Sequence, residues 1–252
     1  MDMKATDPAL RLDHNALSEW DVRVQLAAAY RLVAHFGWDD LVFTHLSARV
    51  PGPEHHFLLN PYGLMFHEIT ASSLVKVDKD GNPVDGDAKV NPAGFTIHSA
   101  VHMVREDAGA VMHLHEPNGV AVSAQKDGLL PLSQTAMLCL PHMAYQEYEG
   151  VALNWDERQR LQNDLGDRHL MLLWNHGVLS VGASVAECFG RLYFLTRACE
   201  IQTMAGSGPH HLPSDEALAT TQQQSSNMAT AAVRGWPALI RLLDARYPGF
   251  RD

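Results

Sequence analysis

The sequence predicts an α/β fold: a three-layer α/β/α sandwich in which helices cover both faces of a central, mainly antiparallel sheet. Two observations support this prediction. Apolar residues recur at helical spacing in several segments, and short apolar runs bounded by turn residues lie between those segments. The resulting order is helix, strands, helix, strand, helix, strand, helix, which is typical of a sheet between two layers of helices.

The first expected elements are a helix and three short strands. Ser18 precedes Asp21 by three positions, as in a capping box, and the helical repeat continues until Gly37, which predicts a helix from about 18 to 36. The turn-forming segment PGPE separates the first two strand-like runs, and the third run leads into the loop DGNPVDGD. The three strands are therefore expected within residues 41–50, 55–61 and 74–78.

The rest of the chain alternates between helices and buried strands. Apolar positions three and four apart predict a helix between Pro92 and the charged residues before Gly109. The next expected elements are a strand at 108–115, a helix at 156–166, a strand at 169–174 and a helix at 184–205. The polar stretch 206–227 is expected to be a surface segment or lid, and a short amphipathic helix closes the chain.

Length and composition favour a single core. A chain of 252 residues that is 46% apolar can bury one sizeable hydrophobic interior. We therefore expect one main domain at 18–205, preceded by an N-terminal extension at 1–17 and followed by a C-terminal tail with its short helix at 206–252.

Charge and cysteine content argue against several partners. The net charge of −10 and the lack of a Lys/Arg-rich run argue against nucleic acid. No run of eighteen apolar residues appears and the N-terminus is polar, so we expect a cytoplasmic protein with no membrane partner. Cys139, Cys188 and Cys199 form no Cys-x-x-Cys motif, which favours buried thiols over a thiolate zinc cluster.

The stretch VMHLHEPNG contains the pattern with the clearest chemistry. On a strand, side chains two apart point to one face about 6.5 to 7 Å apart, so His113 and His115 can converge on one metal ion. A tight site needs a further ligand, and His176 lies just beyond another buried strand, in a turn with Asn175 and Gly177. The residues alone leave a second interpretation open, in which the pair is hydrogen-bonded to backbone.

Several ordered segments are shared with one known family. They are AAAYRLVAHFGWDDLVFTHLSARV, NPYGLMFHEITASSLVKVD, NPAGFTIHSAVH, VMHLHEPNGVAVSAQKDGLLPLS and LLWNHGVLSVGASVAECF. Together they resemble the class II aldolase/adducin family, most closely its adducin-like branch, from about residue 20 to residue 205. The resemblance implies an α/β/α sandwich, often a cyclic homotetramer, with a divalent metal held by His113, His115 and His176. Zinc is the first expectation for this metal, and iron, cobalt or manganese are the alternatives.

The chain departs from the sugar-phosphate aldolases of that family at positions that matter. Those enzymes carry a catalytic glutamate four residues before the histidine that matches His98, and nearby side chains that bind phosphate. This chain has Gly94 for the glutamate, Pro92 and Ala93 for two serines, His45 for an asparagine and Tyr62-Gly63 for a Thr-Gly pair. Glycine moves no proton, and proline and alanine offer no hydroxyl to a phosphate, so a phosphorylated sugar is not the expected substrate.

Other residues are candidates for proton transfer and substrate binding. Glu116 directly follows the metal-site pair, and Pro117 can end the strand so that the acid bends toward the site; the alternative is a solvated or salt-bridged loop acid. His98 shares a helical face with His102, so one of them could face the pocket or pack in the core. Candidate substrate-binding residues are Asn60, Tyr62, Gly63 and Asn175, which could equally be turn residues.

These observations lead to a functional hypothesis with two alternatives. The first hypothesis is a metal-dependent lyase for a small, non-phosphorylated oxo or hydroxy acid, acting by retro-aldol cleavage or decarboxylation through a metal-stabilised enolate. A second is a non-haem iron(II) oxygenase that uses the same three histidines. A third is a non-catalytic, adducin-like oligomeric binding module. The small-molecule substrate itself is not specified by the sequence.

Overall fold

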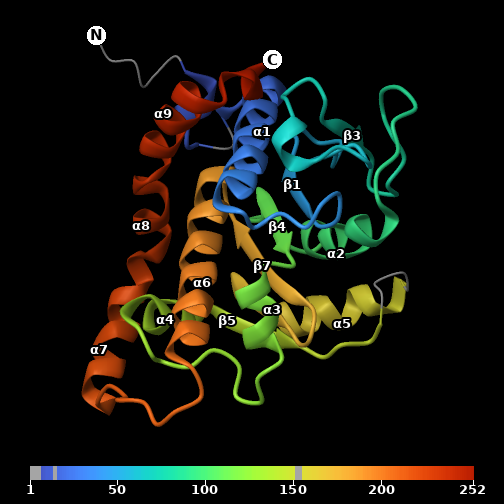
Figure 1. The fold of residues 1–252 in the computed structure, drawn as a ribbon. Helices are drawn as coiled ribbons and strands as arrows, with labels where there is room; N and C mark the ends of the chain where they lie inside the picture. Colours follow the sequence, from blue (N-terminus) through green and yellow to red (C-terminus); the bar gives the residue numbers. More distant parts are fainter. Residues whose placement is uncertain (1–6, 14–15, 151–154) are drawn as a thin grey trace.

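The computed structural model describes residues 7–13, 16–150 and 155–252. The strands within these ranges are β1 (His45–Arg49), β2 (Phe57–Leu59), β3 (Val75–Val77), β4 (Ala110–Leu114), β5 (Met143–Gln146), β6 (Leu170–Leu173) and β7 (Gly177–Gly182). They form one seven-stranded sheet in the order β3-β2-β1-β4-β7-β6-β5 (Figure 1). Every neighbouring pair is antiparallel except β5 and β6, which are parallel. The predicted mainly antiparallel sheet is thus confirmed.

Helices cover both faces of this sheet. In the described residues they are α1 (Glu19–Phe36), α2 (Pro92–His102), α3 (Pro117–Ser123), α4 (Gln134–Cys139), α5 (Trp155–Leu165), α6 (Val185–Ala205), α7 (Asp215–Gln224), α8 (Met228–Arg234) and α9 (Trp236–Arg246). The core on one face includes residues of α1, α6 and α9, whereas α2 and α5 supply the core on the other. Figure 1 shows α1 and α6 side by side, with α2 and α5 away from them. The three-layer α/β/α architecture is therefore as expected.

Local sequence signals fix the ends of α1. The Ser18 side chain accepts a hydrogen bond from the Asp21 amide, and the Asp21 carboxylate accepts one from the Ser18 amide, which completes the predicted capping box. Gly37 ends the helix in the left-handed region, with φ of 69°, where glycine has no Cβ to clash. The observed helix matches the predicted range because these signals lie within a few residues of each other.

Strict alternation along β4 decides which side chains face which helical layer. Ala110, Met112 and Leu114 belong to the core that contains α1 and α6, whereas Val111 belongs to the core with α2 and α5. His113 has the same parity as Val111, so its side chain lies on the α2 face of the sheet. The sheet therefore directs the first candidate metal ligand toward α2.

The C-terminal region differs from the expectation of a polar tail with one short helix. It contains α7, α8 and α9, and α8 lies along α6 (Figure 1). Trp236, at the start of α9, is 1% exposed and donates its indole N–H to the Ala9 carbonyl at 2.7 Å. The prediction was wrong because apolar residues scattered through this polar region, among them Met228, Trp236, Ile240 and Leu243, face the core, although others such as Leu212 are exposed. Among the described helices, none combines the length and apolar character needed to cross a membrane.

Candidate metal centre

One end of the sheet brings the three predicted ligand histidines together. His113 is the fourth residue of β4, where it is paired with His45 on β1 and Leu179 on β7. His115 follows β4 by one residue. His176 lies in the tight turn between β6 and β7, where its amide donates to the Leu173 carbonyl at 3.0 Å.

The turn that carries His176 depends on two special backbone positions. Asn175 has a φ of 57°, a left-handed conformation that asparagine tolerates better than most residues. Gly177 lies so close to the neighbouring strand that a Cβ would be 2.3 Å from the Leu114 carbonyl oxygen. The sequence Asn-His-Gly thus allows β7 to approach β4 closely, and it places the His176 ring beside those of His113 and His115.

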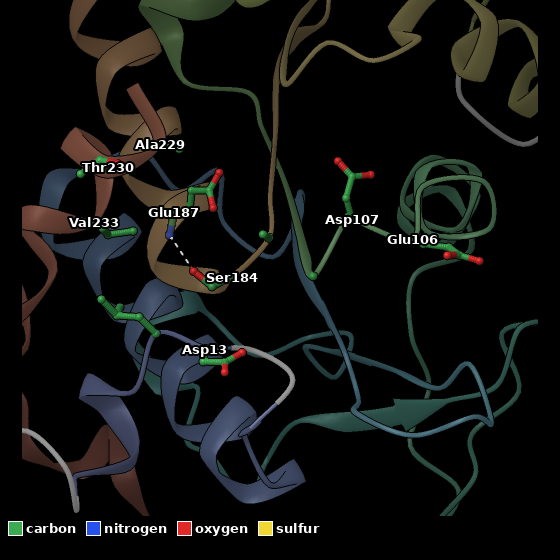
Figure 2. Close-up of a pocket in the computed structure, with 11 residues that line it drawn as sticks. Asp13, Glu106, Asp107, Ser184, Glu187, Ala229, Thr230 and Val233 are labelled. Atoms are coloured by element: carbon green, nitrogen blue, oxygen red, sulfur yellow. Dashed lines mark hydrogen bonds between the residues drawn. The ribbon is translucent and has the colours of Figure 1, made fainter. Parts of the chain in front are cut away.

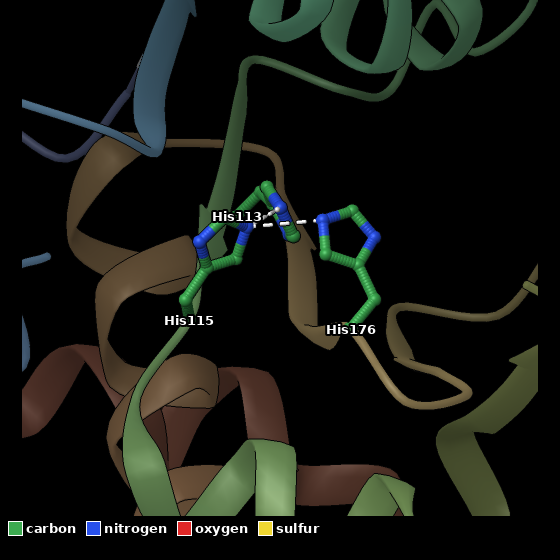
Figure 3. Close-up of side chains that lie close together, drawn as sticks. All are labelled: His113, His115 and His176. Carbon is green, nitrogen blue, oxygen red and sulfur yellow. Dashed lines mark hydrogen bonds between the residues drawn. The ribbon is translucent and has the colours of Figure 1, made fainter. Parts of the chain in front are cut away.

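The Nε2 atoms of the three rings converge (Figure 3). The Nε2 atom of His115 lies 3.2 Å from that of His113 and 3.0 Å from that of His176, and the three potential ligand atoms all lie within 4.8 Å of one another. In a tetrahedral site with Zn–N bonds of about 2.0–2.1 Å, neighbouring ligand nitrogens lie about 3.3 Å apart. The spacing therefore fits a single first-row divalent cation.

Hydrogen bonds on the far side of two rings fix the state of the converging atoms. His113 Nδ1 lies 3.0 Å from the Val178 carbonyl oxygen, which can only accept, so Nδ1 carries the proton. His115 Nδ1 likewise faces Asp40 Oδ2 at 3.1 Å. When these two rings are neutral, each Nε2 atom carries an unshared lone pair, and the two lone pairs face each other. A cation between the two atoms stabilises this arrangement.

Burial and the neighbouring rings keep His113 and His176 neutral. Burial, followed by repulsion from His176 and His115, lowers the pKa of His113 well below 6.5. Burial and then His115 lower the pKa of His176 to about 4. Neutral imidazole is the form that binds metals, so the environment favours coordination at neutral pH.

Asp40 is a site residue that the sequence interpretation missed. It lies in the loop between α1 and β1, where Leu41 and Thr44 have left-handed φ values of 51° and 66° and the Phe43 amide donates to the Asp40 carbonyl at 2.8 Å. This tight loop brings the carboxylate to His115 across 75 positions of sequence. The available signal was an acidic Asp-Asp pair directly after a helix end, which is too common to identify a partner.

A second group of histidines lies between β1 and α2. Ser47 Oγ lies 2.6 Å from His98 Nδ1 and 2.8 Å from His102 Nε2, and His102 Nδ1 lies 3.1 Å from the Ala108 carbonyl oxygen. Because a carbonyl oxygen can only accept, the proton lies on His102 Nδ1. In a neutral His102, Nε2 then accepts a hydrogen bond from the Ser47 hydroxyl. The Ser47 oxygen in turn accepts a hydrogen bond from His98 Nδ1. This chain of hydrogen bonds leaves a lone pair on His98 Nε2.

The environment of His98 is consistent with that assignment. Its Nε2 is buried and has no hydrogen-bond partner. Burial, then the neighbouring His45 and His102, lower the pKa of His98 well below 6.5, and the backbone of His45 acts in the opposite direction. Burial also lowers the pKa of His45 to about 4. Both rings are neutral at physiological pH.

Glu116, the predicted candidate acid, lies at the start of α3. Its Oε2 accepts from the Gly119 amide at 2.8 Å, and its Oε1 accepts from the Asn118 side chain at 2.6 Å. The residue is 4% exposed and is the N-cap of the helix. Both oxygens are thus bonded to the first turn of the helix.

The four candidate substrate-binding residues have different environments. Asn60 is buried, and its Oδ1 accepts from the Tyr30 hydroxyl at 2.8 Å while its Nδ2 has no partner. Tyr62 is 53% exposed, and Gly63 has a φ of 104°, which glycine adopts readily. Asn175 is exposed beside His176. Of the four, Asn175 is thus the one next to a proposed ligand in sequence.

Comparison with known proteins identifies the family. The family model "Class II Aldolase and Adducin N-terminal domain" matches residues 24–203, which include all three converging histidines. The chain belongs to the class II aldolase and adducin family.

Relatives in this family fall into two groups. A Caulobacter vibrioides protein with an aldolase class 2 name is 56% identical over 240 residues, which are 93% of each chain. Rat alpha-adducin is 46% identical over 193 residues, which are 74% of this chain and 26% of that protein. Sequence similarity therefore links the chain both to proteins named as aldolases and to adducins.

Solved structures of class II aldolases have the same fold. An aldolase II superfamily protein from Pseudomonas syringae superposes with a TM-score of 0.90 at 49% identity, over 93% of this chain and 96% of that one. L-fuculose 1-phosphate aldolase from Glaciozyma antarctica superposes with a TM-score of 0.78 at 26% identity, over 91% and 92% of the two chains. The class II aldolase fold is thereby shown for this chain.

A cavity at the other end of this class II aldolase fold has a different character (Figure 2). It has a volume of about 370 Å³ and is lined by residues before β4 and after β7, including Asp107, Ser184 and Glu187. None of the three converging histidines lines it. Asp107 pairs with Arg105 at 2.7 Å and Glu187 pairs with Arg191 at 2.6 Å, so these acids already have cationic partners.

Proposed function

We propose that the protein is a divalent-metal-dependent lyase that acts on a small, non-phosphorylated oxo or hydroxy acid. The observation that carries this proposal is the convergence of three imidazole Nε2 atoms, with the Nδ1 atom of two of the rings facing an oxygen acceptor on the far side. His113, His115 and His176 would hold the cation, with zinc as the expected metal. A cation there polarises a carbonyl and stabilises negative charge on a substrate oxygen, as cleavage of a bond next to a carbonyl requires.

The proton-transfer role falls to His98 in this proposal. The hydrogen-bond chain through Ser47 and His102 holds the His98 ring with a lone pair on Nε2, on the same face of the sheet as His113. A buried neutral imidazole with a free lone pair can accept a proton from a substrate hydroxyl. Glu116 is engaged in its helix cap, and we propose that it positions the segment after His115.

Sequence departures support a non-phosphorylated substrate. The positions that match phosphate-binding serines in sugar-phosphate aldolases are Pro92 and Ala93, and Gly94 matches the catalytic glutamate. A small hydroxy or oxo acid needs neither group, because its carboxylate and adjacent oxygen can both bind a cation with open positions. Asn175 and the loop of Asn60, Tyr62 and Gly63 remain proposed substrate contacts.

Metal content tests the centre directly. Protein purified without chelator should contain about one divalent ion per chain by elemental analysis. His113→Ala and His176→Ala should lose this ion while they keep the far-UV circular dichroism of the wild type. His67→Ala, which changes an exposed histidine outside the centre, should keep the ion. Full metal occupancy in His113→Ala would contradict the ligand assignment.

The adducin relatives favour one competing function, an oligomeric binding module without catalysis. In that case any bound metal would be structural, and no acid would be cleaved after loading with zinc, iron(II), cobalt or manganese. The lyase proposal expects metal-dependent release of an aldehyde from a hydroxy acid, or of carbon dioxide from an oxo acid, for one member of a panel of both kinds of acid, followed by NMR. If the resident metal is iron, oxygen consumption separates the oxygenase alternative from the lyase.

The same proposal includes a homotetramer, which light scattering tests, and a cytoplasmic location.

A further inference from the structure

His45 occupies the space into which a side chain at position 94 would project. A Cβ built on Gly94, in the first turn of α2, would lie 2.1 Å from His45 Nδ1, 2.3 Å from Cε1 and 2.4 Å from Cγ. Contacts this short with three ring atoms mean that the imidazole ring lies against the glycine backbone. A histidine at position 45 in this orientation therefore requires glycine at position 94.

The same ring lies beside the proposed metal centre. His45 is the first residue of β1 and is directly opposite His113 in the antiparallel pair with β4. Opposite residues of an antiparallel pair place their Cβ atoms about 4.5–5.5 Å apart on one face of the sheet. Ser47, two residues further along β1, bonds to His98 on α2, so the His45 side chain also faces α2. His45 and His113 are therefore neighbours in the same layer.

His45 is 3% exposed, and one of its ring nitrogens, Nε2, has no hydrogen-bond partner within the described residues. His98 Nε2 has none either, and the two rings meet edge to face with centroids 6.1 Å apart. Buried polar atoms without partners are rare in folded proteins and need a reason, such as a ligand that completes them.

We propose that His45 is a substrate-contacting residue, whose Nε2 hydrogen-bonds an oxygen of the bound acid beside the metal, and that Gly94 is its specificity partner. In a neutral imidazole, Nε2 is either a donor or an acceptor, depending on the tautomer. As a donor it can bind a hydroxyl, carbonyl or carboxylate oxygen, and as an acceptor it can bind a hydroxyl. Sugar-phosphate aldolases of the family carry a glutamate at the position of Gly94. In this chain the His45 ring, from β1, fills the space beside that position. This inference rests on the proposed metal-dependent function, because the acid must be anchored at the three histidines.

A small dicarboxylate tests the contact. Oxalate carries two adjacent carboxylates, and cobalt(II) reports ligand exchange through its visible spectrum. Cobalt-loaded wild type should bind oxalate, and His45→Phe should bind it about tenfold more weakly, the effect of about one lost hydrogen bond. His45→Ala should show the same loss, which guards against a misfit of the larger ring. His67→Phe is the control. Cobalt affinity, measured by chelator competition, should be similar in all variants.

The outcomes separate this inference from the proposed function. If the wild type does not bind cobalt, the metal centre is refuted and this inference with it. If the wild type binds cobalt but not oxalate, or if both His45 variants bind oxalate as tightly as the wild type, the metal centre stands and the contact is overturned. Loss of cobalt from the His45 variants would also overturn it, because His45 would then be part of the metal site.

A double-mutant cycle tests the shared space without any ligand. Gly94→Ala should lower the thermal midpoint of the wild type, because the methyl group displaces the imidazole ring. In a His45→Ala background the same methyl group should fit, so most of the loss should disappear. Gly235→Ala is the matched control, since nothing lies within 4 Å of its added methyl group. An equal loss in both backgrounds would show that the ring does not fill the space beside Gly94.

Discussion

Asp40 is a carboxylate that contacts a proposed metal ligand, His115, from the side away from the converging nitrogens. Its Oδ2 faces His115 Nδ1 at 3.1 Å, so the opposite ring nitrogen is directed toward His113 and His176. Such carboxylate–histidine pairs fix the orientation of the ring and raise the basicity of the ligand nitrogen. His113 has the corresponding bond to the Val178 carbonyl, which is neutral. Of the three proposed ligands, we therefore expect His115 to be the one whose strength depends on a carboxylate partner.

We expect Asp40→Asn to weaken metal binding by about 10- to 100-fold, because the amide keeps the shape of the side chain but loses the charge. The measurement is the dissociation constant for zinc, by competition with a chromophoric chelator. Asp39→Asn is the matched control, since it removes one charge at the adjacent position. Equal affinities of wild type and Asp40→Asn would show that the carboxylate has no influence on the centre.

At the scale of elements, α3 begins directly after the segment that carries the proposed ligands His113 and His115. Glu116 follows His115 and caps α3 by accepting a hydrogen bond from the Gly119 amide. Gly119 packs closely against β7, because a Cβ at this position would lie 2.6 Å from a Val178 methyl group. The end of β4, the cap and the start of α3 are thus one continuous unit. The geometry of the metal centre depends on this unit because it fixes the direction of the chain after His115.

The capping role predicts a specific response to substitution. Glu116→Ala should lower the free energy of unfolding by about 0.5–2 kcal/mol, the usual effect of removing an N-cap. Glu116→Gln should be milder, because its amide oxygen can still accept the Gly119 proton. Urea unfolding gives the stabilities. If Glu116→Gln kept full stability and metal but abolished turnover of an identified substrate, the residue would be the proton-transfer acid and the proposed assignment of His98 would be wrong.

At the scale of the whole molecule, buried neutral histidines make stability depend on pH. Burial lowers the pKa of His169 to about 4, with Arg191 and Arg105 adding to the effect and Asp107 opposing it. His45 and His176 also have pKa values of about 4. In the unfolded chain these groups titrate near 6.5. Between pH 6.5 and 4 the unfolded state binds more protons, so stability is full above pH 6.5 and falls as the pH drops.

His169→Asn should make this acid sensitivity shallower. The wild type loses stability between pH 6.5 and 4 partly because unfolding allows His169 to take up as much as one proton, and asparagine cannot do so. The slope of unfolding free energy against pH, from urea titrations in the presence of chelator, measures the difference. His169 lies outside the metal centre, so the comparison is free of metal release. Parallel slopes in the two proteins would contradict the lowered pKa.

Much of the fold and part of the site could be predicted from the chain itself. Helix α1, strands β1, β2 and β4 and the α2 helix follow from signals within a few residues of one another. The parity of β4 predicted a shared face for His113 and His115, and the Asn-His-Gly turn indicated His176. The short strand β5 was missed, because its four residues lack a clear period and pair in parallel with β6.

The sequence by itself predicted strands at β4 and β6, the three converging histidines and the lack of an acid at position 94, but not β7 or α3 beside them. Only the tertiary structure decided that Asp40 lies beside His115 and that the His45 ring fills the space beside Gly94. The physical reason is the range of the interactions. Periodicity and caps act between residues close in sequence, whereas Asp40 and His115 are 75 positions apart and meet only when the sheet and its loops have packed.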